Sequence, residues 1–393
     1  MKKMMIMFVS LILVFFCSCA KVDDMREPNL TQESEVVFNS APVSNNAPTK
    51  GLLKSPVHTK GDMTENFGVF GYVHPDTYVS GGYLMKNAEY VVSTGLAANG
   101  AKYYWPKADN LSDIKVNFVA LYPYSTTAYA LDANDTVTYS LATTTLDSVS
   151  SVDVLWATRY QVSPVNRAFP QANDSNDAVS LHFKHALSLV EFWAKKADGQ
   201  NITKVEVTKV EFLDGSDAAA EIHTDGTLKI YAKKNDAANE AAYVPTFALG
   251  STTVNNFNFA VNNVKDSLLG GASWAYPANA LSSAIIIPQA VPAKVKITFN
   301  ITITNGTDAI VYSGRTVTRT INTGTSENSQ TYVANWESGK RYIYRFYISA
   351  DDVQFDVTVD DWTDGNSNPF DVWDHNETAY VERFFDKAST MQA

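Results

Sequence analysis

The stretch Lys294–Thr304 reads Lys-Val-Lys-Ile-Thr-Phe-Asn-Ile-Thr-Ile-Thr, and its alternation decides the fold class. Polar residues hold every even position, and the odd positions are Val295, Ile297, Phe299, Ile301 and Ile303. Successive side chains of a strand point to opposite faces, so strict alternation predicts one buried face and one solvated face. That pattern is typical of antiparallel sheets that cover a core on one side.

The same period of two recurs along most of the chain. Within residues 205–212 the alternation changes phase after Val207, which predicts a β-bulge near Thr208-Lys209. Helical periodicity is almost absent before the last residues, and Asp-Gly and Asn-Gly turns such as Asp214-Gly215 separate the apolar runs. The sequence therefore predicts an all-β protein of antiparallel β-sandwiches, which at 393 residues we expect to form two domains in tandem.

The N-terminus has the features of an export signal. Met1-Lys2-Lys3 precedes an apolar run that ends at Phe16, which is shorter than the roughly 20 residues of a membrane-spanning helix. Cys17 follows the bulky Phe16, whereas Cys19 follows the small Ser18. We therefore predict a lipoprotein signal peptide over residues 1–19 with lipidation at Cys19. An ordinary signal peptide is the alternative.

Composition excludes several classes of function. The chain has two cysteines, both in the signal region, so the mature protein is expected to lack disulfides, cysteine zinc sites and thiol nucleophiles. A formal net charge of −11 argues against nucleic acid as a partner. His182 and His185 would face opposite sides of a strand, and His185 is expected to be buried and bonded to backbone. We find no catalytic motif and expect no catalytic residue, metal or cofactor.

Residues 20–60 form a polar, proline-interrupted leader that contains one apolar island. Val36, Val37 and Phe38 make up this island and are predicted to form a short strand. Lys50 and Lys60 each precede a glycine and are the candidate processing sites, because proteases need exposed, flexible backbone. A solvated linker without processing is the alternative interpretation.

We expect an N-terminal β-sandwich over 61–176 and a C-terminal β-sandwich over 177–362. The segment from Pro170 to Asp177, which is rich in Asn, Asp and Ser, marks the boundary between them. A boundary near Gly199 is the alternative. The tail over 363–393 allows two interpretations. Phe370 and Val372 alternate around Asp371 as in a strand, whereas the residues that recur at helical spacing are Tyr380, Val381, Phe384, Phe385 and Ala388.

A series of motifs in fixed order gives the chain a family resemblance. The motifs include Phe67–Tyr72, Tyr104-Trp105-Pro106, Asn117–Tyr124, Asp153–Ala157, Val179–Ser188, Ile285–Gln289, Trp336–Tyr344 and Asp361-Trp362. Together with the lipoprotein start and the leader, they resemble the fimbrillin family of Bacteroidetes, the subunits of type V pili. The resemblance covers nearly the whole mature chain.

The resemblance implies two transthyretin-like β-sandwiches, no enzyme activity, and a surface lipoprotein on the outer membrane held there by its lipid. It also implies that a trypsin-like protease removes the leader together with its strand and that a strand from the C-terminal region of another fimbrial subunit takes its place. The family's processing site is usually an arginine, whereas Lys50 and Lys60 stand at the expected positions here. Arg26 lies before the candidate strand, so cleavage there would leave the strand attached.

We therefore expect a structural or adhesive subunit of a cell-surface fimbrium. Its expected partners are related subunits and a ligand on a host or bacterial surface. The first alternative is a lipid-anchored module that binds glycan or host protein without polymerising. The second is a surface enzyme acting on glycans, which would need two carboxylates roughly 5–10 Å apart in a cleft. The sequence leaves open the receptor and the choice between stalk, tip and anchor.

Overall fold

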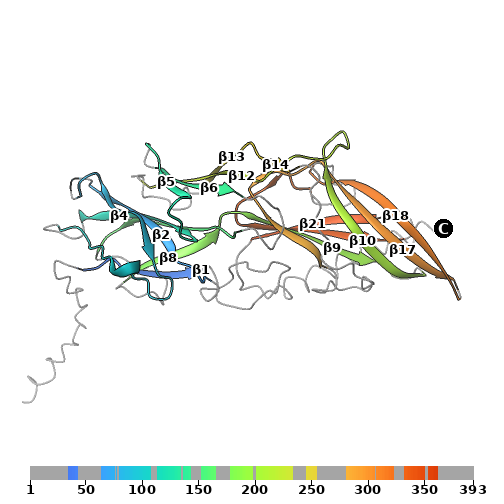
Figure 1. Cartoon of the computed structure of the whole chain (residues 1–393), viewed down its shortest axis with the longest axis horizontal. Coiled ribbons are helices and arrows are strands. Elements are labelled where there is room, and N and C mark those ends of the chain that lie inside the picture. Colours follow the sequence, from blue (N-terminus) through green and yellow to red (C-terminus); the bar gives the residue numbers. More distant parts are fainter. Residues whose placement is uncertain are drawn as a thin grey trace, which may run out of the picture.

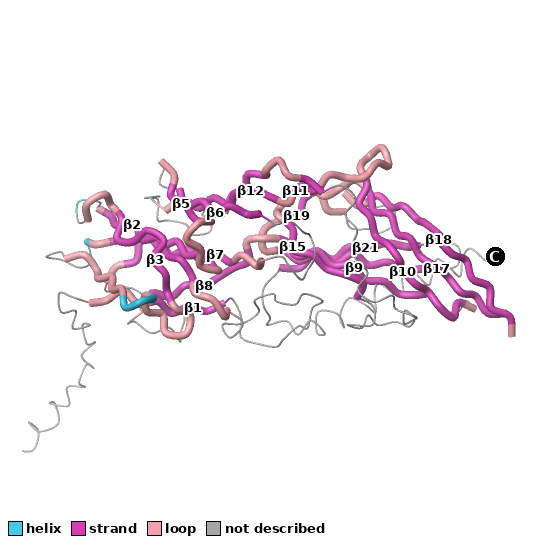
Figure 2. The backbone as a smooth tube through the Cα atoms, in the orientation of Figure 1, coloured by secondary structure: helices cyan, strands magenta, loops and turns pink. Residues whose placement is uncertain are grey.

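The computed structural model describes residues 34–42, 63–75, 77, 79–107, 113–133, 136–142, 152–164, 178–197, 201–232, 245–254, 280–305, 307–322, 332–349 and 353–361. Nearly every element in these ranges is a strand, as the alternation predicted, and the fold is all-β (Figure 2). A short 3-10 turn, η2 (Ala98–Gly100), interrupts the strands. Among the described residues no helix is long and apolar enough to cross a membrane.

A six-stranded sheet forms one end of the molecule (Figure 1). Its strands, in spatial order, are β1 (Phe38–Pro42), β8 (Val179–His185), β7 (Leu155–Val162), β4 (Lys115–Tyr122), β2 (Phe67–His74) and β3 (Tyr83–Tyr90). One face packs on a four-stranded sheet of β13 (Thr246–Leu249), β12 (Asp225–Tyr231), β6 (Thr136–Ala142) and β5 (Tyr129–Leu131).

The other end is a β-sandwich (Figure 1). One layer contains β10 (Ile202–Leu213), β17 (Lys294–Asn305) and β18 (Asp308–Thr320). The second layer contains β15 (Ala280–Ile286), β9 (Ser188–Lys196), β20 (Lys340–Ile348) and β21 (Val353–Asp361). Two small pairs complete the described sheets: β11 (Ile222–His223) with β14 (Thr253–Val254), and β16 (Gln289–Ala290) with β19 (Asn335–Trp336).

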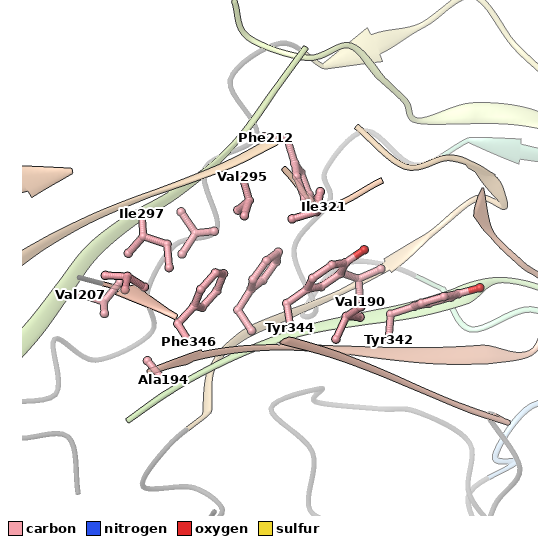
Figure 3. Packing of buried hydrophobic residues seen from close by; sticks show 14 of the residues in the cluster. Val190, Ala194, Val207, Phe212, Val295, Ile297, Ile321, Tyr342, Tyr344 and Phe346 are labelled. Carbon is pink, nitrogen blue, oxygen red and sulfur yellow. The ribbon is translucent and has the colours of Figure 1, made fainter. Parts of the chain in front are cut away.

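The predicted face of β17 is confirmed. On β17, the side chains of Val295, Ile297, Phe299 and Ile301 are buried, whereas Ile303 near the strand end is partly buried. They pack against β20, where the buried side chains on the same core are Tyr342, Tyr344, Phe346 and Ile348 (Figure 3). The expected bulge is also present, because the pairing of β10 with β17 shifts register between Val207 and Lys209.

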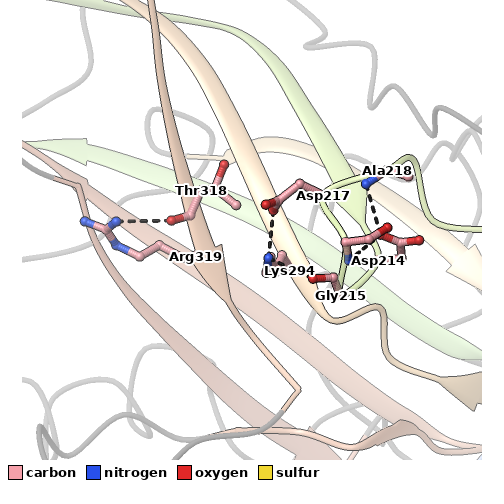
Figure 4. Close-up of polar contacts among 8 residues, drawn as sticks. Asp214, Gly215, Asp217, Ala218, Lys294, Thr318 and Arg319 are labelled. Carbon is pink, nitrogen blue, oxygen red and sulfur yellow. Dashed lines mark hydrogen bonds and ion pairs between the residues drawn. The ribbon is translucent and has the colours of Figure 1, made fainter.

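The Asp-Gly turn after β10 holds the ends of two strands together (Figure 4). The Asp214 carboxylate accepts hydrogen bonds from the backbone N–H of Ser216 at 2.8 Å and of Ala218 at 2.9 Å. Asp217 pairs with the Lys294 ammonium at the start of β17, at 2.8 Å. The hydrogen bond from the Ser216 hydroxyl, at 2.8 Å, and then those from the backbone N–H groups of Ala218 and Ser216 lower the pKa of the Asp214 carboxyl, because they stabilise its charged form.

Strands from both sides of the predicted boundary at residues 176 and 177 share sheets. β8 pairs with β7, and β12 pairs with β6. Only Ala186 and Leu187 separate β8 from β9, which belongs to the sandwich at the other end of the molecule. The number and limits of the domains stay predictions.

Candidate functional site

The apolar island of the leader lies in a groove at the edge of the six-stranded sheet. We call residues 34–42 the leader segment. Its second half is β1, which runs parallel to β8 with five residue pairs from Phe38 opposite Val179 to Pro42 opposite Phe183. Its first half forms an antiparallel bridge between Glu35 and Tyr104. The strand begins at Phe38, so Val36 and Val37 of the apolar island precede it, and the leader segment is bonded along both edges.

Backbone hydrogen bonds alternate between the two walls of this leader groove. The Val36 N–H donates to the Tyr103 carbonyl at 2.7 Å, and the Phe38 N–H donates to the Gly95 carbonyl at 3.0 Å. On the opposite wall, the Val179 N–H donates to the Val37 carbonyl at 2.8 Å. This alternation is the pattern of an extended strand inserted between two others.

Two side chains of the leader segment enter the hydrophobic core. Val36 and Phe38 are 1% and 2% exposed, respectively. The Phe38 ring makes edge-to-face contacts with Tyr90 at 4.7 Å, Phe118 at 5.1 Å and Phe67 at 6.3 Å between ring centroids. Burial of one such apolar side chain contributes roughly 1.5–3 kcal/mol. The segment therefore completes the core of this end of the molecule.

A glycine lets the leader segment approach the groove wall. Gly95 has a φ of +67°, and a Cβ atom at this position would lie 1.7 Å from the Phe38 carbonyl oxygen. Any other residue would both strain this left-handed backbone and collide with the leader segment. Gly95 therefore sets how closely a strand can lie in the groove.

The floor of the groove contains a buried tyrosine. The Tyr90 hydroxyl donates to the Val36 carbonyl at 3.4 Å. Burial raises the pKa of Tyr90 far above its ordinary value, and the nearby Tyr103 and Glu35 act in the same direction. The hydroxyl consequently stays protonated and serves as a donor to the backbone of the strand in the groove.

The structure describes only part of the predicted site. Val36, Val37 and Phe38 lie in the groove, with Val37 half-buried and facing away from the core residues. The other predicted site residues lie outside the described residues: Cys19, Lys50, Lys60, Phe370, Val372, Val381, Phe384 and Phe385.

Sequence reasoning missed the groove wall itself. This wall contains Tyr103-Tyr104-Trp105, whose backbone bonds to the leader segment, and Trp105 is buried. Tyr104 is 41% exposed. Exposed Tyr104 and buried Trp105 alternate as neighbouring residues of a strand do. Nothing in the local sequence, however, indicates which strand this segment pairs with.

His185 is buried as expected, but the expected partner was wrong. Its Nδ1 lies 3.0 Å from the Asp153 carboxylate rather than only against backbone, and both side chains are nearly inaccessible to solvent. Asp153 precedes β7, 32 residues earlier in the chain, and alternation within β8 cannot indicate so distant a partner. In the described part of the chain, no group of three or more His, Cys, Asp or Glu side chains is arranged to hold a metal ion.

Comparison with known proteins identifies the family. A model described as fimbrillin-like matches residues 57–362. A fimbrial protein from Bacteroides vulgatus is 16% identical with a TM-score of 0.47, over 84% of this chain and 99% of that one. The tip fimbrial protein Mfa3 from Porphyromonas gingivalis, with C-terminal truncation, is 8% identical with a TM-score of 0.37, over 84% and 100%. No curated protein matches. Since the family model spans most of the sequence, the chain belongs to the fimbrillin-like family.

Proposed function

We propose that this protein is a structural or adhesive subunit of a cell-surface fimbrium and has no enzymatic role. Its leader segment holds the place that a strand from another subunit takes after processing. The observation that carries this proposal is the position of the leader segment, which fills an edge groove with Val36 and Phe38 in the core. Membership in the fimbrillin-like family supports the same function.

The groove has the features that addition of a strand from another subunit requires. An open sheet edge offers unpaired backbone groups, and the core sites of the groove offer space for alternate side chains of the incoming strand. In the intact chain the leader segment is covalently attached, so its effective concentration at the groove is high and a separate strand cannot compete. Cleavage removes this advantage.

In the sequence, the candidate processing sites lie between the leader segment and β2. Lys50 and Lys60 both follow Pro42, the last residue of β1, and precede Phe67, the first residue of β2. Cleavage at either lysine would therefore leave the leader segment bound only by noncovalent contacts. We propose that the exported chain is first anchored at the outer membrane by lipid on Cys19 and that processing then permits assembly.

Controlled proteolysis tests the proposal. The purified full-length chain is treated with a lysine-specific protease, and assembly is followed by electron microscopy and size-exclusion chromatography. We expect fibres from the parent and monomers from the double variant Lys50→Gln/Lys60→Gln. A variant with Lys229→Gln, at an exposed lysine of β12, serves as the control and should assemble like the parent.

Fibres from the double variant at the parental rate would refute groove opening by cleavage at these lysines. In that case a lipid-anchored binding module that keeps its leader segment becomes the better interpretation. The N-terminal residue of protein sheared from cells gives an independent readout, because a processed subunit begins after Lys50 or Lys60.

A further inference from the structure

We propose that two copies of this chain pair side by side along the outer edge of β18, as antiparallel strands related by a two-fold axis at Val311. The interaction surface is residues 308–315, and the partner that fits it is the same segment of a second copy. This surface is separate from the leader groove, because β18 and β1 lie at opposite ends of the molecule (Figure 1).

The outer edge of β18 is open. This strand is the last of the three-stranded sheet, and among the described strands it pairs only with β17. Its other edge therefore offers backbone N–H and C=O groups to an incoming strand. The strand runs from Asp308 to Thr320 and contains neither proline nor lysine, the residues that commonly block an exposed edge.

Three consecutive large apolar residues are exposed on this strand. Ile310, Val311 and Tyr312 are 50%, 60% and 42% exposed, respectively. Because neighbouring side chains point to opposite faces, the strand is apolar on both faces here. Ile310 lies opposite Ile303 of β17, which is itself only partly buried. A partner strand along the edge would therefore extend an apolar surface that the described core leaves open.

A β-bulge brings Arg315 onto the same face as Tyr312. Arg315 lies opposite Phe299, and Tyr312 lies opposite Ile301. Phe299 and Ile301 are both buried on the core face of β17, and directly paired residues of antiparallel strands share a face. The bulge contains Gly314, whose φ of +66° gives the left-handed backbone that glycine adopts readily.

The row of side chains on this face is complementary to itself. It reads Asp308, Ile310, Tyr312, Arg315. A second copy that runs antiparallel about Val311 presents the row in reverse, so each Asp308 faces an Arg315 and each Ile310 faces a Tyr312. Opposite charges and apolar pairs across antiparallel strands are stabilising. Within the described part of the chain, neither Asp308 nor Arg315 forms an ion pair.

The charges at the two ends of the row select both the partner and the register. A strand of different sequence would place an apolar or like-charged residue opposite Asp308 or Arg315, which disfavours that partner. Shifting the second copy so that Asp308 faces Tyr312 leaves Arg315 without an acidic partner. The pairing about Val311 satisfies both charges at once.

We expect a single pair to be weak. One strand edge is small compared with the roughly 1,200–2,000 Å² buried in stable protein interfaces. A dimer of this kind would dissociate on the dilution of a size-exclusion column. If the chain forms fimbriae as proposed above, repeated pairs between neighbouring filaments would act together and hold the filaments side by side.

Cysteine trapping tests the pair, because a disulfide captures weak complexes. The full-length, uncleaved chain carries Cys17→Ser and Cys19→Ser, so that an engineered thiol is the only one. Val311→Cys places this thiol on the axis, where opposed Cβ atoms lie about 4.5–5.5 Å apart, close to the spacing that a disulfide bridges. Thr320→Cys is the matched control, at an exposed residue at the far end of the same strand.

Non-reducing gels follow covalent dimer under mild oxidation. We expect Val311→Cys to form dimer roughly tenfold faster than Thr320→Cys, because only thiols on the axis lie within bonding distance. Equal rates would overturn the pairing. Since the leader segment stays attached throughout, this result does not depend on processing, and the proposed function is tested separately by cleavage.

Exchange of the charges tests the register. In the Val311→Cys chain, Asp308→Arg or Arg315→Asp places like charges opposite each other, so each variant alone should form dimer more slowly. An equimolar mixture of the two variants restores opposite charges at both ends of a mixed pair. We expect mixed dimers, identified by mass, at the rate of the Val311→Cys chain. Single variants that dimerise at that same rate, or mixed dimers that form no faster than the dimers of either variant alone, would overturn the proposed register. Thermal melting verifies that each variant is folded.

Discussion

The backbone carbonyl oxygen of Phe38 lies 1.7 Å from the point that a Cβ atom on Gly95 would occupy. The leader segment and the turn that contains Gly95 are thus in direct backbone contact, also joined by the hydrogen bond from the Phe38 N–H to the Gly95 carbonyl at 3.0 Å. The position of the leader segment in the groove consequently depends on the absence of a side chain at Gly95.

The first prediction concerns this contact. Gly95→Ala should displace the leader segment, because the new methyl group collides with Phe38. Gly100→Ala is the matched control: its φ is +72°, so the backbone strain of about 1–2 kcal/mol is similar, but no atom lies within 4 Å of the added Cβ. We expect a clearly lower melting temperature for Gly95→Ala and faster proteolysis at Lys50 and Lys60. Equal melting temperatures would contradict the contact.

The second prediction concerns the aromatic site of the groove. Phe38→Ala should destabilise the intact chain by about 3–5 kcal/mol, because it leaves a cavity among the rings of Tyr90, Phe118 and Phe67. Val37→Ala should cost far less, since Val37 is only half-buried. Urea denaturation followed by tryptophan fluorescence measures both. Similar midpoints for the two variants would show that the leader segment does not contribute to the core.

The third prediction concerns the predicted faces of β17. Ile301→Asp should reduce the free energy of unfolding by several kcal/mol, because it places a charge where the side chain is 1% exposed. The neighbouring Thr302 points to the other face and is half-buried, so Thr302→Asp should have a small effect. Thermal melting monitored by circular dichroism compares them, and equal melting temperatures would refute the assigned faces.

The fourth prediction concerns pH. Burial raises the pKa of the Glu211 carboxyl, but the hydrogen bond from Lys209 and the charges of Lys209 and Lys296 outweigh it and lower the pKa below 4.5. Since the folded-state pKa is depressed, the stabilisation is present above the unfolded-state pKa and is lost as the pH falls through the folded-state pKa. Glu211→Gln should therefore melt below the parent at pH 7, and the gap should narrow below about pH 4.3.

A second background provides the control for this pH effect. In a Lys209→Ala chain the hydrogen bond to Glu211 is absent, so Glu211→Gln should change the melting temperature less at pH 7. A gap between parent and Glu211→Gln that is constant from pH 7 to pH 3 would mean that the ion pairs contribute no stability.

The fifth prediction concerns export. Cys19→Ala should abolish incorporation of labelled fatty acid and leave an unprocessed precursor, because Cys19 follows a small residue. Each buried methylene of a lipid chain contributes about 0.8 kcal/mol to membrane attachment. Cys17→Ala is the control and should be labelled like the parent. Continued labelling of Cys19→Ala would place the lipid elsewhere.

Alternation in the sequence was sufficient to predict which face of a long strand is buried. The buried set on β17 and the phase change in β10 follow from local geometry, because neighbouring side chains of a strand point to opposite sides whatever strand lies beside it. Ile303 is only partly buried because it lies near the end of β17, where the described core thins. Such end effects depend on the length of the opposing layer.

The candidate site was predicted only in part, because a local sequence pattern does not specify pairing between distant segments. An apolar island in a polar leader indicated Val36, Val37 and Phe38, since such residues gain stability only when they are buried. Their partners could not be predicted, because β8 lies about 140 residues later and the bridging Tyr104 lies about 70 residues later. Nothing in a local pattern specifies pairing over such distances.

The sequence by itself determined the all-β class, the buried face of β17 and the presence of an apolar island in the leader. The tertiary structure alone decided that this strand runs parallel to β8, that Tyr103-Tyr104-Trp105 forms the opposite wall, and that Gly95 must lack a side chain. The physical reason is that side-chain alternation is a property of one strand, whereas backbone hydrogen bonds and close approaches belong to pairs of strands brought together by the whole fold.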